Sequence, residues 1–96
     1  MVITVLEARV PTDRLADVET LFRQGMADLP PEIVESYLAK DIRDASLYRL
    51  NTVWRSHQAL EAMRTSGLKP KGVQMFEAVG ANPTLSIFEV VVHGHH

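Results

Sequence analysis

The amino-acid sequence predicts an α+β fold in which helices cover one face of a four-stranded antiparallel sheet. Segments rich in β-branched and aromatic residues alternate with segments whose apolar residues recur at helical spacing. The 96 residues leave room for one domain, which we place at residues 1–92, and residues 93–96 form a histidine-rich tail. The chain contains no cysteine, which excludes disulfides, thiolate metal sites and a cysteine nucleophile.

The chain is expected to begin with a strand and an amphipathic helix. Residues 2–10 are rich in valine, isoleucine and threonine, which favour strands. Pro11 ends this strand, and Thr12 is suited to cap the following helix because its hydroxyl accepts backbone N–H groups. Apolar residues then recur at helical spacing from Leu15 to Leu29, where the following proline pair ends the pattern.

A hairpin and a second helix are expected next. Residues 33–41 and 47–54 are strand-like, and the polar link between them predicts a hairpin. Ser56 is suited to cap the second helix, and Gly67 is suited to end it in the left-handed conformation.

A short third helix and a last strand complete the prediction. Val73, Phe76 and Val79 indicate a helix that ends near Gly80, and residues 84–92 are typical of a strand. The resulting order, βαββα(α)β, is the split-βαβ, ferredoxin-like arrangement.

The sheet face away from the helices is expected to be covered by a second copy of the chain. Strand alternation allows seven apolar residues to share this face. Because contiguous apolar patches of that size mark interfaces, we expect a homodimer formed sheet to sheet. The seven residues are Ile3, Val5, Leu47, Val53, Leu85, Ile87 and Val91.

Charge and hydropathy argue against two classes of partner. The net charge of −2 at pH 7 disfavours nucleic acid, because binding to its backbone needs a basic surface. No stretch approaches the roughly 18 uncharged apolar residues of a membrane span. The chain also begins without the basic segment of a secretory signal. We expect no nucleic-acid partner, no membrane association and a cytoplasmic location.

The junction between the third strand and the next helix resembles a family motif. Residues 54–62 read WRSHQALEA, which is similar to the W-x-S-x-x-A-L-x-A junction of the antibiotic biosynthesis monooxygenase family, within the dimeric α/β-barrel superfamily. The order of elements resembles this family over nearly the whole chain. The resemblance implies two ferredoxin-like subunits paired through their sheets, with a pocket between sheet and helices in each. It implies activities such as cofactor-free oxygenation of aromatic polyketides and quinols, haem breakdown or isomerisation of signalling molecules.

Three aromatic residues are candidates for the pocket wall. Tyr48 and Trp54 share one face of their strand, and Phe88 belongs to the last strand. If that face is turned to the helices, the aromatic side chains suit a planar aromatic substrate, and the Tyr48 hydroxyl orients a ring oxygen. The alternative is that these side chains pack in the core.

His57 is a candidate general base. It follows Trp54 by three residues, in the first turn of the second helix, where the helix dipole disfavours its protonation. Cofactor-free oxygenation needs a base that deprotonates the substrate, so that the anion passes an electron to oxygen. The alternative is an exposed histidine without a role.

Polar residues are expected on the opposite face of the sheet. Charges on a buried face need partners, so we expect salt bridges across the subunit interface, such as Arg49 or Arg9 with Glu89 or Glu7. The alternative is a polar binding site, in which Asn51 donates a hydrogen bond to a substrate oxygen.

No metal or cofactor is expected. The tail, residues 93–96, contains three histidines but no carboxylate, and we place no metal there. Haem-degrading members of the family pair a first-strand Asn with the third-strand Trp and a His farther along the next helix. Here the first strand has no Asn, and His57 is the only histidine close after Trp54.

These candidates favour a cofactor-independent monooxygenase-like protein that acts on a small aromatic or quinol substrate. The expected catalytic residues are His57, Trp54 and Tyr48, and substrate binding adds Phe88 and Asn51. The alternative is a non-catalytic, dimeric small-molecule-binding or accessory protein on the same fold, which the scarcity of titratable groups on the aromatic face favours. An open cavity of about 300–1,000 Å³ would indicate a substrate site, and a filled core would indicate the alternative.

Overall fold

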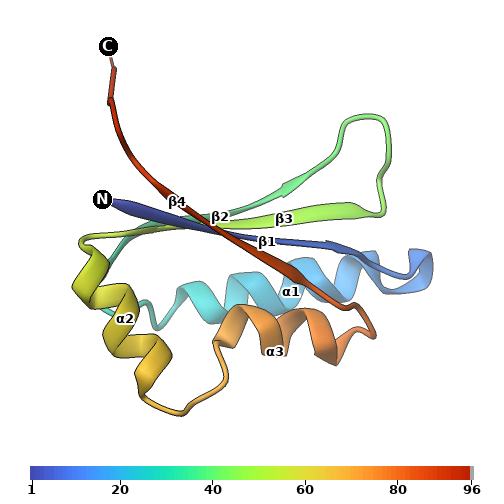
Figure 1. Cartoon of the computed structure of the whole chain (residues 1–96). Coiled ribbons are helices and arrows are strands. Elements are labelled where there is room, and N and C mark those ends of the chain that lie inside the picture. The colour runs from blue at the N-terminus through green and yellow to red at the C-terminus, as the bar shows by residue number, and fades with distance from the viewer. Residues whose placement is uncertain (96) are drawn as a thin grey trace.

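The computed structural model describes residues 1–95 and, within them, places one four-stranded sheet against three α-helices (Figure 1). All three helices lie on the same side of the sheet. The elements in chain order are β1 (Val2–Arg9), the 3₁₀ helix η1 (Thr12–Arg14), α1 (Leu15–Met26), β2 (Ile33–Lys40), β3 (Leu47–Trp54), α2 (His57–Thr65), α3 (Lys71–Ala78) and β4 (Thr84–Glu89).

The sheet has the strand order β2-β3-β1-β4, and each neighbouring pair is antiparallel. This topology confirms the predicted α+β, ferredoxin-like fold. The two central strands, β1 and β3, pair along their whole length, from Val2 opposite Trp54 to Arg9 opposite Leu47. Within residues 1–95, no helix is long and apolar enough to cross a lipid bilayer.

Side chains alternate between the two sides of the sheet, as the two-residue period of a strand requires. In β1 the residues Val2, Thr4, Leu6 and Ala8 are buried beneath the helices. The residues between them are half-buried or exposed and lie on the opposite side, which we call the open face. Leu50, Thr52 and Trp54 of β3 lie across from the buried β1 residues and are buried with them.

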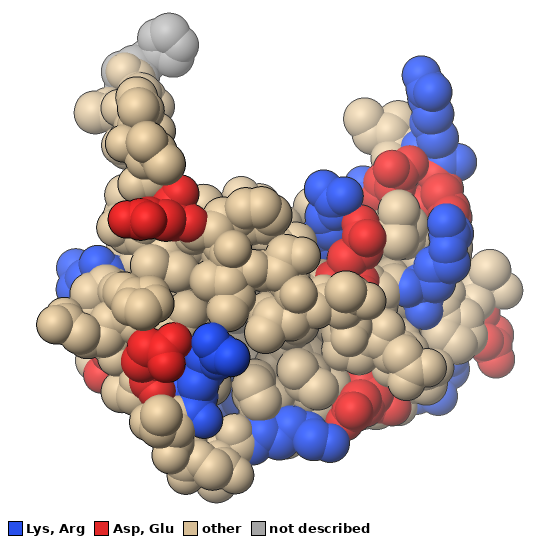
Figure 2. All heavy atoms as spheres, viewed as in Figure 1, with Lys and Arg blue, Asp and Glu red and all other residues tan. Residues whose placement is uncertain are grey.

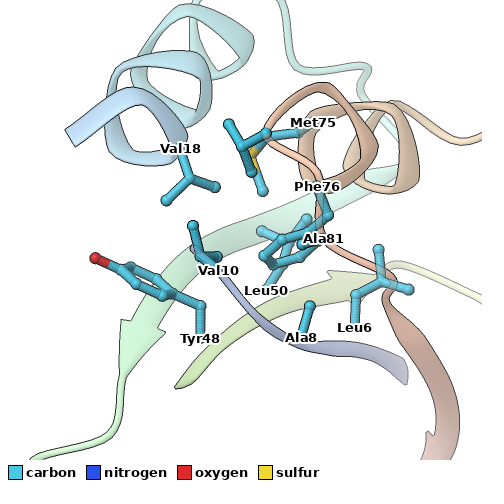
Figure 3. Close-up of a cluster of buried hydrophobic side chains, with 10 residues drawn as sticks. Leu6, Ala8, Val10, Val18, Tyr48, Leu50, Met75, Phe76 and Ala81 are labelled. Carbon is cyan, nitrogen blue, oxygen red and sulfur yellow. The ribbon is translucent and has the colours of Figure 1, made fainter. Parts of the chain in front are cut away.

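The larger core cluster lies between α1, α3 and the centre of the sheet (Figure 3). Val18 of α1 and Phe76 of α3 are fully buried there. Tyr48 of β3 is 2% exposed, and its ring lies beside Val10. The Tyr48 hydroxyl donates a hydrogen bond of 2.6 Å to Oε2 of Glu19. Burial and this carboxylate together raise the pKa of Tyr48 to about 12.

Several predicted element ends are confirmed and one cap is wrong. The Ser56 hydroxyl accepts the Ala59 N–H at 3.1 Å at the start of α2. Gly67 and Gly80 both have φ near +80°, the conformation that glycine adopts at lowest cost. Thr12 does not cap α1, because the chain first forms η1, and neither helix start has a side-chain cap.

The last strand is shorter than predicted. The chain leaves β4 after Glu89, which lies opposite Val2 at the beginning of β1. Val90 still donates its N–H to the Met1 carbonyl oxygen at 3.0 Å, but β1 offers no partner beyond this point. Val91 and Val92 are therefore outside the sheet, each 87% exposed.

The predicted assignment of β4 side chains to the two sides of the sheet is wrong. Leu85 and Ile87 lie opposite Leu6 and Thr4, so they are on the helix side and not on the open face. Phe88 lies opposite Ile3 and is on the open face. Glu89 was expected on the open face but lies opposite Val2, on the helix side. Apolar residues occur at both odd and even positions of this strand, so its composition alone does not determine which side of the sheet they occupy.

Short hydrogen bonds fix the turn between β2 and β3. Oδ1 of Asp41 accepts the N–H groups of Arg43 and Asp44 at 2.7 and 2.9 Å. The carboxylate of Asp44 accepts the Ser46 hydroxyl and pairs with Arg9, and these contacts lower its pKa to about 2. Charged side chains of both signs gather over this hairpin, at the upper right of Figure 2.

The Tyr48–Glu19 contact makes the free energy of unfolding depend on pH in the alkaline range. Between about pH 10 and pH 12 the unfolded chain ionises Tyr48 while the folded chain keeps it protonated, so the free energy of unfolding falls as pH rises. Tyr48→Phe should be about 1 kcal/mol less stable at pH 7 and should lose part of this pH dependence. Urea unfolding at pH 7 to 11.5 measures both. If the free energy of unfolding fell equally steeply with pH in the variant and in the original chain, the raised pKa of Tyr48 would be contradicted.

Candidate functional site

A pocket of about 530 Å³ lies between the sheet and the helices. Its volume is within the usual range for small-molecule sites. The floor comes from the helix side of the sheet, and the walls come from α1, α2, the start of α3 and the segments that join them. The floor includes Thr4, Leu6, Ser36, Leu50 and Thr52, and Trp54 at the end of β3 forms part of the wall.

A glycine allows α3 to begin close to this floor. A Cβ atom at Gly72 would lie 2.5 Å from Cδ2 of Leu50 and 2.8 Å from Cδ1 of Leu6. Both distances are below van der Waals contact, so a side chain at position 72 would displace the ends of the two leucines. Because both leucines form the floor, a side chain at position 72 would change the shape of the pocket at this end.

Three hydroxyls form a line across the floor, which we call the hydroxyl row. Thr4, Thr52 and Ser36 lie directly opposite one another on β1, β3 and β2. Nε1–H of Trp54 donates to Oγ1 of Thr4 at 3.0 Å, and the Ser36 and Thr52 hydroxyl oxygens are 3.2 Å apart. Thr4 and Thr52 are the only buried polar residues among those that the structure describes.

The hydroxyl row has hydrogen-bonding capacity left for a ligand. A hydroxyl has one donor hydrogen and two acceptor lone pairs. Thr4 accepts from Trp54, and no acceptor within residues 1–95 takes its own hydrogen. In the Ser36–Thr52 pair only one of the two hydrogens is used. The floor can therefore donate O–H groups to an oxygen of a bound molecule.

Of the predicted site residues, Trp54 lies in the pocket wall. Tyr48 does not line the pocket, because its ring belongs to the core cluster and its hydroxyl is bound to Glu19. Of its two interpretations, core packing is the correct one. Phe88 is 56% exposed on the open face, so the expectation that it borders the pocket is wrong.

His57 and Asn51 also lie outside the pocket. The His57 side chain is 72% exposed, and its Nε2 is 3.8 Å from Oε1 of Glu61, one turn later on the outer side of α2. This position does not bring the imidazole to a molecule in the pocket. Asn51 lies on the open face, as expected, and its Nδ2 donates to the Arg49 carbonyl oxygen at 3.5 Å.

Three of the four charged residues expected to pair across an interface have partners within the same chain. Nε of Arg49 is 2.7 Å from Oε1 of Glu7, which lies directly opposite it on β1. Arg9 pairs with Asp44 of the hairpin. The salt bridges therefore join neighbouring elements of one protomer.

The pocket does not fit haem held through its iron. Haem proteins bind the iron by histidine, cysteine or tyrosine, or by methionine together with histidine. Among the described residues that line the pocket there is no histidine or tyrosine, and the chain has no cysteine. The thioethers of Met26, Met63 and Met75 lack the histidine partner.

A second hollow, of about 550 Å³, lies at the β2–β3 hairpin. The seven described residues that line it belong to the two strand ends and the loop, and none is aromatic. The pocket between sheet and helices is therefore the candidate site for an aromatic molecule.

Replacing Thr4 should expose the importance of the hydroxyl row for stability. Thr4→Val leaves the buried indole N–H of Trp54 without its acceptor, so the free energy of unfolding should fall by about 1–3 kcal/mol. Thr84→Val makes the same change at an exposed strand position and should stay within about 0.5 kcal/mol. Urea unfolding measures both variants. A Thr4→Val protein as stable as the original chain would contradict the hydrogen bond.

No family model and no curated protein matches the sequence. Solved structures do match it over nearly its whole length. A Deinococcus radiodurans protein described as an antibiotic biosynthesis monooxygenase has a TM-score of 0.75 at 15% identity, covering 100% of this chain and 98% of its own. SnoaB of Streptomyces nogalater, a cofactor-independent oxygenase, has a TM-score of 0.69 at 17% identity, covering 96% of this chain and 95% of its own.

A third similar structure is the haem degrader MhuD of Mycobacterium tuberculosis, with two haems bound in its active site. Its TM-score is 0.73 at 20% identity, and the match covers 99% of this chain and all of MhuD. These similarities confirm the resemblance predicted from the sequence at the level of the fold. The chain has the ferredoxin-like fold of the antibiotic biosynthesis monooxygenases.

Proposed function

We propose that this protein binds a small aromatic or quinol molecule in the pocket and oxygenates it without a cofactor. The observation that carries the proposal is the composition of the pocket: apolar walls, one indole ring and a row of hydroxyls on the floor. The fold supports it, because one of the similar structures is that of a cofactor-independent oxygenase.

Trp54 supplies an oriented aromatic surface. Its ring is buried, and the hydrogen bond from Nε1 to Thr4 fixes its rotation. An aromatic ligand stacked on such a ring gains about 0.5–1.5 kcal/mol beyond the burial of its area. The leucine, methionine and phenylalanine side chains of the other walls remove the rest of the ligand from water.

Thr4 is the residue that we assign to the reacting part of the ligand. Its free O–H donates to a ring oxygen and stabilises that oxygen as a phenolate or enolate, since a hydrogen bond to a charged group is the stronger kind. The anion passes an electron to dioxygen, and a carbon–oxygen bond forms. For an anthrone, the ring CH₂ becomes C=O, and its two hydrogens leave with the second oxygen atom as water.

One observation favours a second candidate, a non-catalytic binding protein. Among the described residues of the pocket, the floor carries no imidazole or carboxylate that could act as a general base. The pocket contains one carboxylate, that of Asp28, which is highly exposed. Oxygenation in this pocket is therefore proposed for substrates that ionise readily, such as hydroxyanthrones and quinols.

Oxygen uptake distinguishes the two functions. With 1,8-dihydroxyanthrone or a quinol in an oxygen electrode, the protein should increase the rate above that of spontaneous oxidation. Thr4→Val should lower the protein-dependent rate about tenfold, the equivalent of one charge-assisted hydrogen bond. His57→Ala is the matched control and should keep the full rate, because its side chain lies outside the pocket.

The outcomes separate clearly. Ligand binding without any increase in oxygen uptake would favour the non-catalytic function. A loss of activity in His57→Ala would contradict the position of the site. Absence of binding by every aromatic ligand would overturn both functions.

We also propose that the chain forms a homodimer through the open face of the sheet. Ile3, Val5, Tyr37 and Phe88 lie on this face, and Tyr37 and Phe88 are at least half exposed. A chain of this size buries a modest core, and exposed apolar patches mark interfaces. The Glu7–Arg49 pair on the same face is already neutralised within the protomer, which lowers the cost of covering it.

Phe88→Asp should abolish this dimer. An unpaired charge in the interface costs about 3 kcal/mol or more, which raises the dimer Kd at least about a hundredfold. Leu68→Asp is the control, because Leu68 is exposed on the opposite side of the molecule, at the pocket. Sedimentation velocity at micromolar concentration should find Phe88→Asp monomeric and Leu68→Asp dimeric. A monomeric original chain would overturn the proposal.

A further inference from the structure

The rim of the pocket is exposed and charged, whereas its floor is buried and largely apolar. The lining residues Leu50, Trp54 and Leu60 are buried in the floor and walls, whereas most lining residues between Arg64 and Lys71 are exposed to solvent. Three of these exposed lining residues carry a positive charge, and we call them the cationic rim: Arg64, Lys69 and Lys71. They come from the last turn of α2, the connection and the first residue of α3.

The carboxylates that pair with two of these cations do not line the pocket. Arg64 pairs with Glu61 at 3.3 Å, and Lys69 pairs with Glu77 at 2.7 Å. Neither Glu61 nor Glu77 is a pocket residue, and both ion pairs are exposed, so they are worth little and an acid group in the pocket can compete for either cation.

Lys71 has the weakest partner of the three. Its Nζ is 3.8 Å from Oδ2 of Asp28, and both side chains are more than 70% exposed. An exposed pair at this distance is worth little. Three cations and one carboxylate give the lining a net charge of plus two, in a chain whose net charge is −2.

We infer that the pocket takes an aromatic molecule that carries an acid group. This inference rests on the proposed function, in which the aromatic body occupies the apolar floor. The acid group lies at the rim, where it pairs with Arg64 and replaces Asp28 as the partner of Lys71. Because the rim is exposed, each cation changes the affinity about two- to fivefold, and added salt weakens the effect.

A pair of fluorescent probes tests this charge selection. 1-Anilinonaphthalene-8-sulfonate and N-phenyl-1-naphthylamine share one ring skeleton, and only the first carries an acid group. Trp54 is the only tryptophan of the chain and lies in the pocket, so quenching of its emission reports binding. The double variant Arg64→Gln/Lys71→Gln should raise the Kd of the sulfonate about fivefold or more. It should leave the Kd of the neutral probe within about twofold.

Two controls assign the effect to the rim and the binding to the pocket. Lys40→Gln/Arg43→Gln removes the same charge from the hairpin and should change neither Kd, because neither residue lines the pocket. Gly72→Ala forces the floor side chains Leu50 and Leu6 to shift and should change the Kd of both probes alike.

Three results would overturn the inference. One is an unchanged sulfonate Kd in the rim variant, and another is an equal loss for both probes in that variant. The third is a rise in the sulfonate Kd in Lys40→Gln/Arg43→Gln that equals the rise in the rim variant. In each of these cases aromatic binding still stands. If neither probe quenches Trp54 in the folded protein, the proposed function fails together with the inference.

Discussion

The hydrogen-bond register between β1 and β3 determines the chemistry of the pocket. It sets Thr4 opposite Thr52 and within reach of the Trp54 indole, on the side that the helices cover. A shift by one residue would transfer every side chain of the strand to the other side of the sheet. If β1 shifted, Val5 would join the floor in place of Thr4, and Thr4 would lie on the open face, away from Thr52 and the indole. The strand register therefore decides which side chains face the pocket.

Local patterns in the sequence were sufficient for the architecture. Valine-rich strands, helical spacing from Leu15 onward and the caps at Ser56 and Gly67 all depend on neighbours within a few residues. The topology follows from their order, because few arrangements of four strands and the intervening helices bury the apolar faces. The cap at Thr12 and the length of β4 were wrong. The side assignment of β4 was also wrong, since Leu85, Ile87 and Phe88 place apolar residues at both odd and even positions of the strand.

The candidate site was less accessible to sequence reasoning, because its groups are defined by distant contacts. The position of Tyr48 within β3 suggested that it lines the pocket. Its hydroxyl instead donates to Glu19, which lies far earlier in the chain, in the core. His57 is close to Trp54 in sequence, yet the turn of α2 directs it outward beside Glu61. The hydroxyl row was missed because threonine is an ordinary strand residue. Its meaning appears only when Thr4, Thr52 and Ser36 are aligned across three strands.

The bond between Trp54 and Thr4 has a consequence for the ligand binding that we propose. Thr4 accepts from the indole through its oxygen and has its hydrogen available for an incoming molecule. When that hydrogen is donated, the hydroxyl becomes more polarised and accepts the indole N–H more strongly, because consecutive hydrogen bonds reinforce one another. Occupancy therefore stiffens the aromatic wall that holds the occupant. Ligand binding and the rigidity of the Trp54 side chain are therefore coupled through Oγ1 of Thr4.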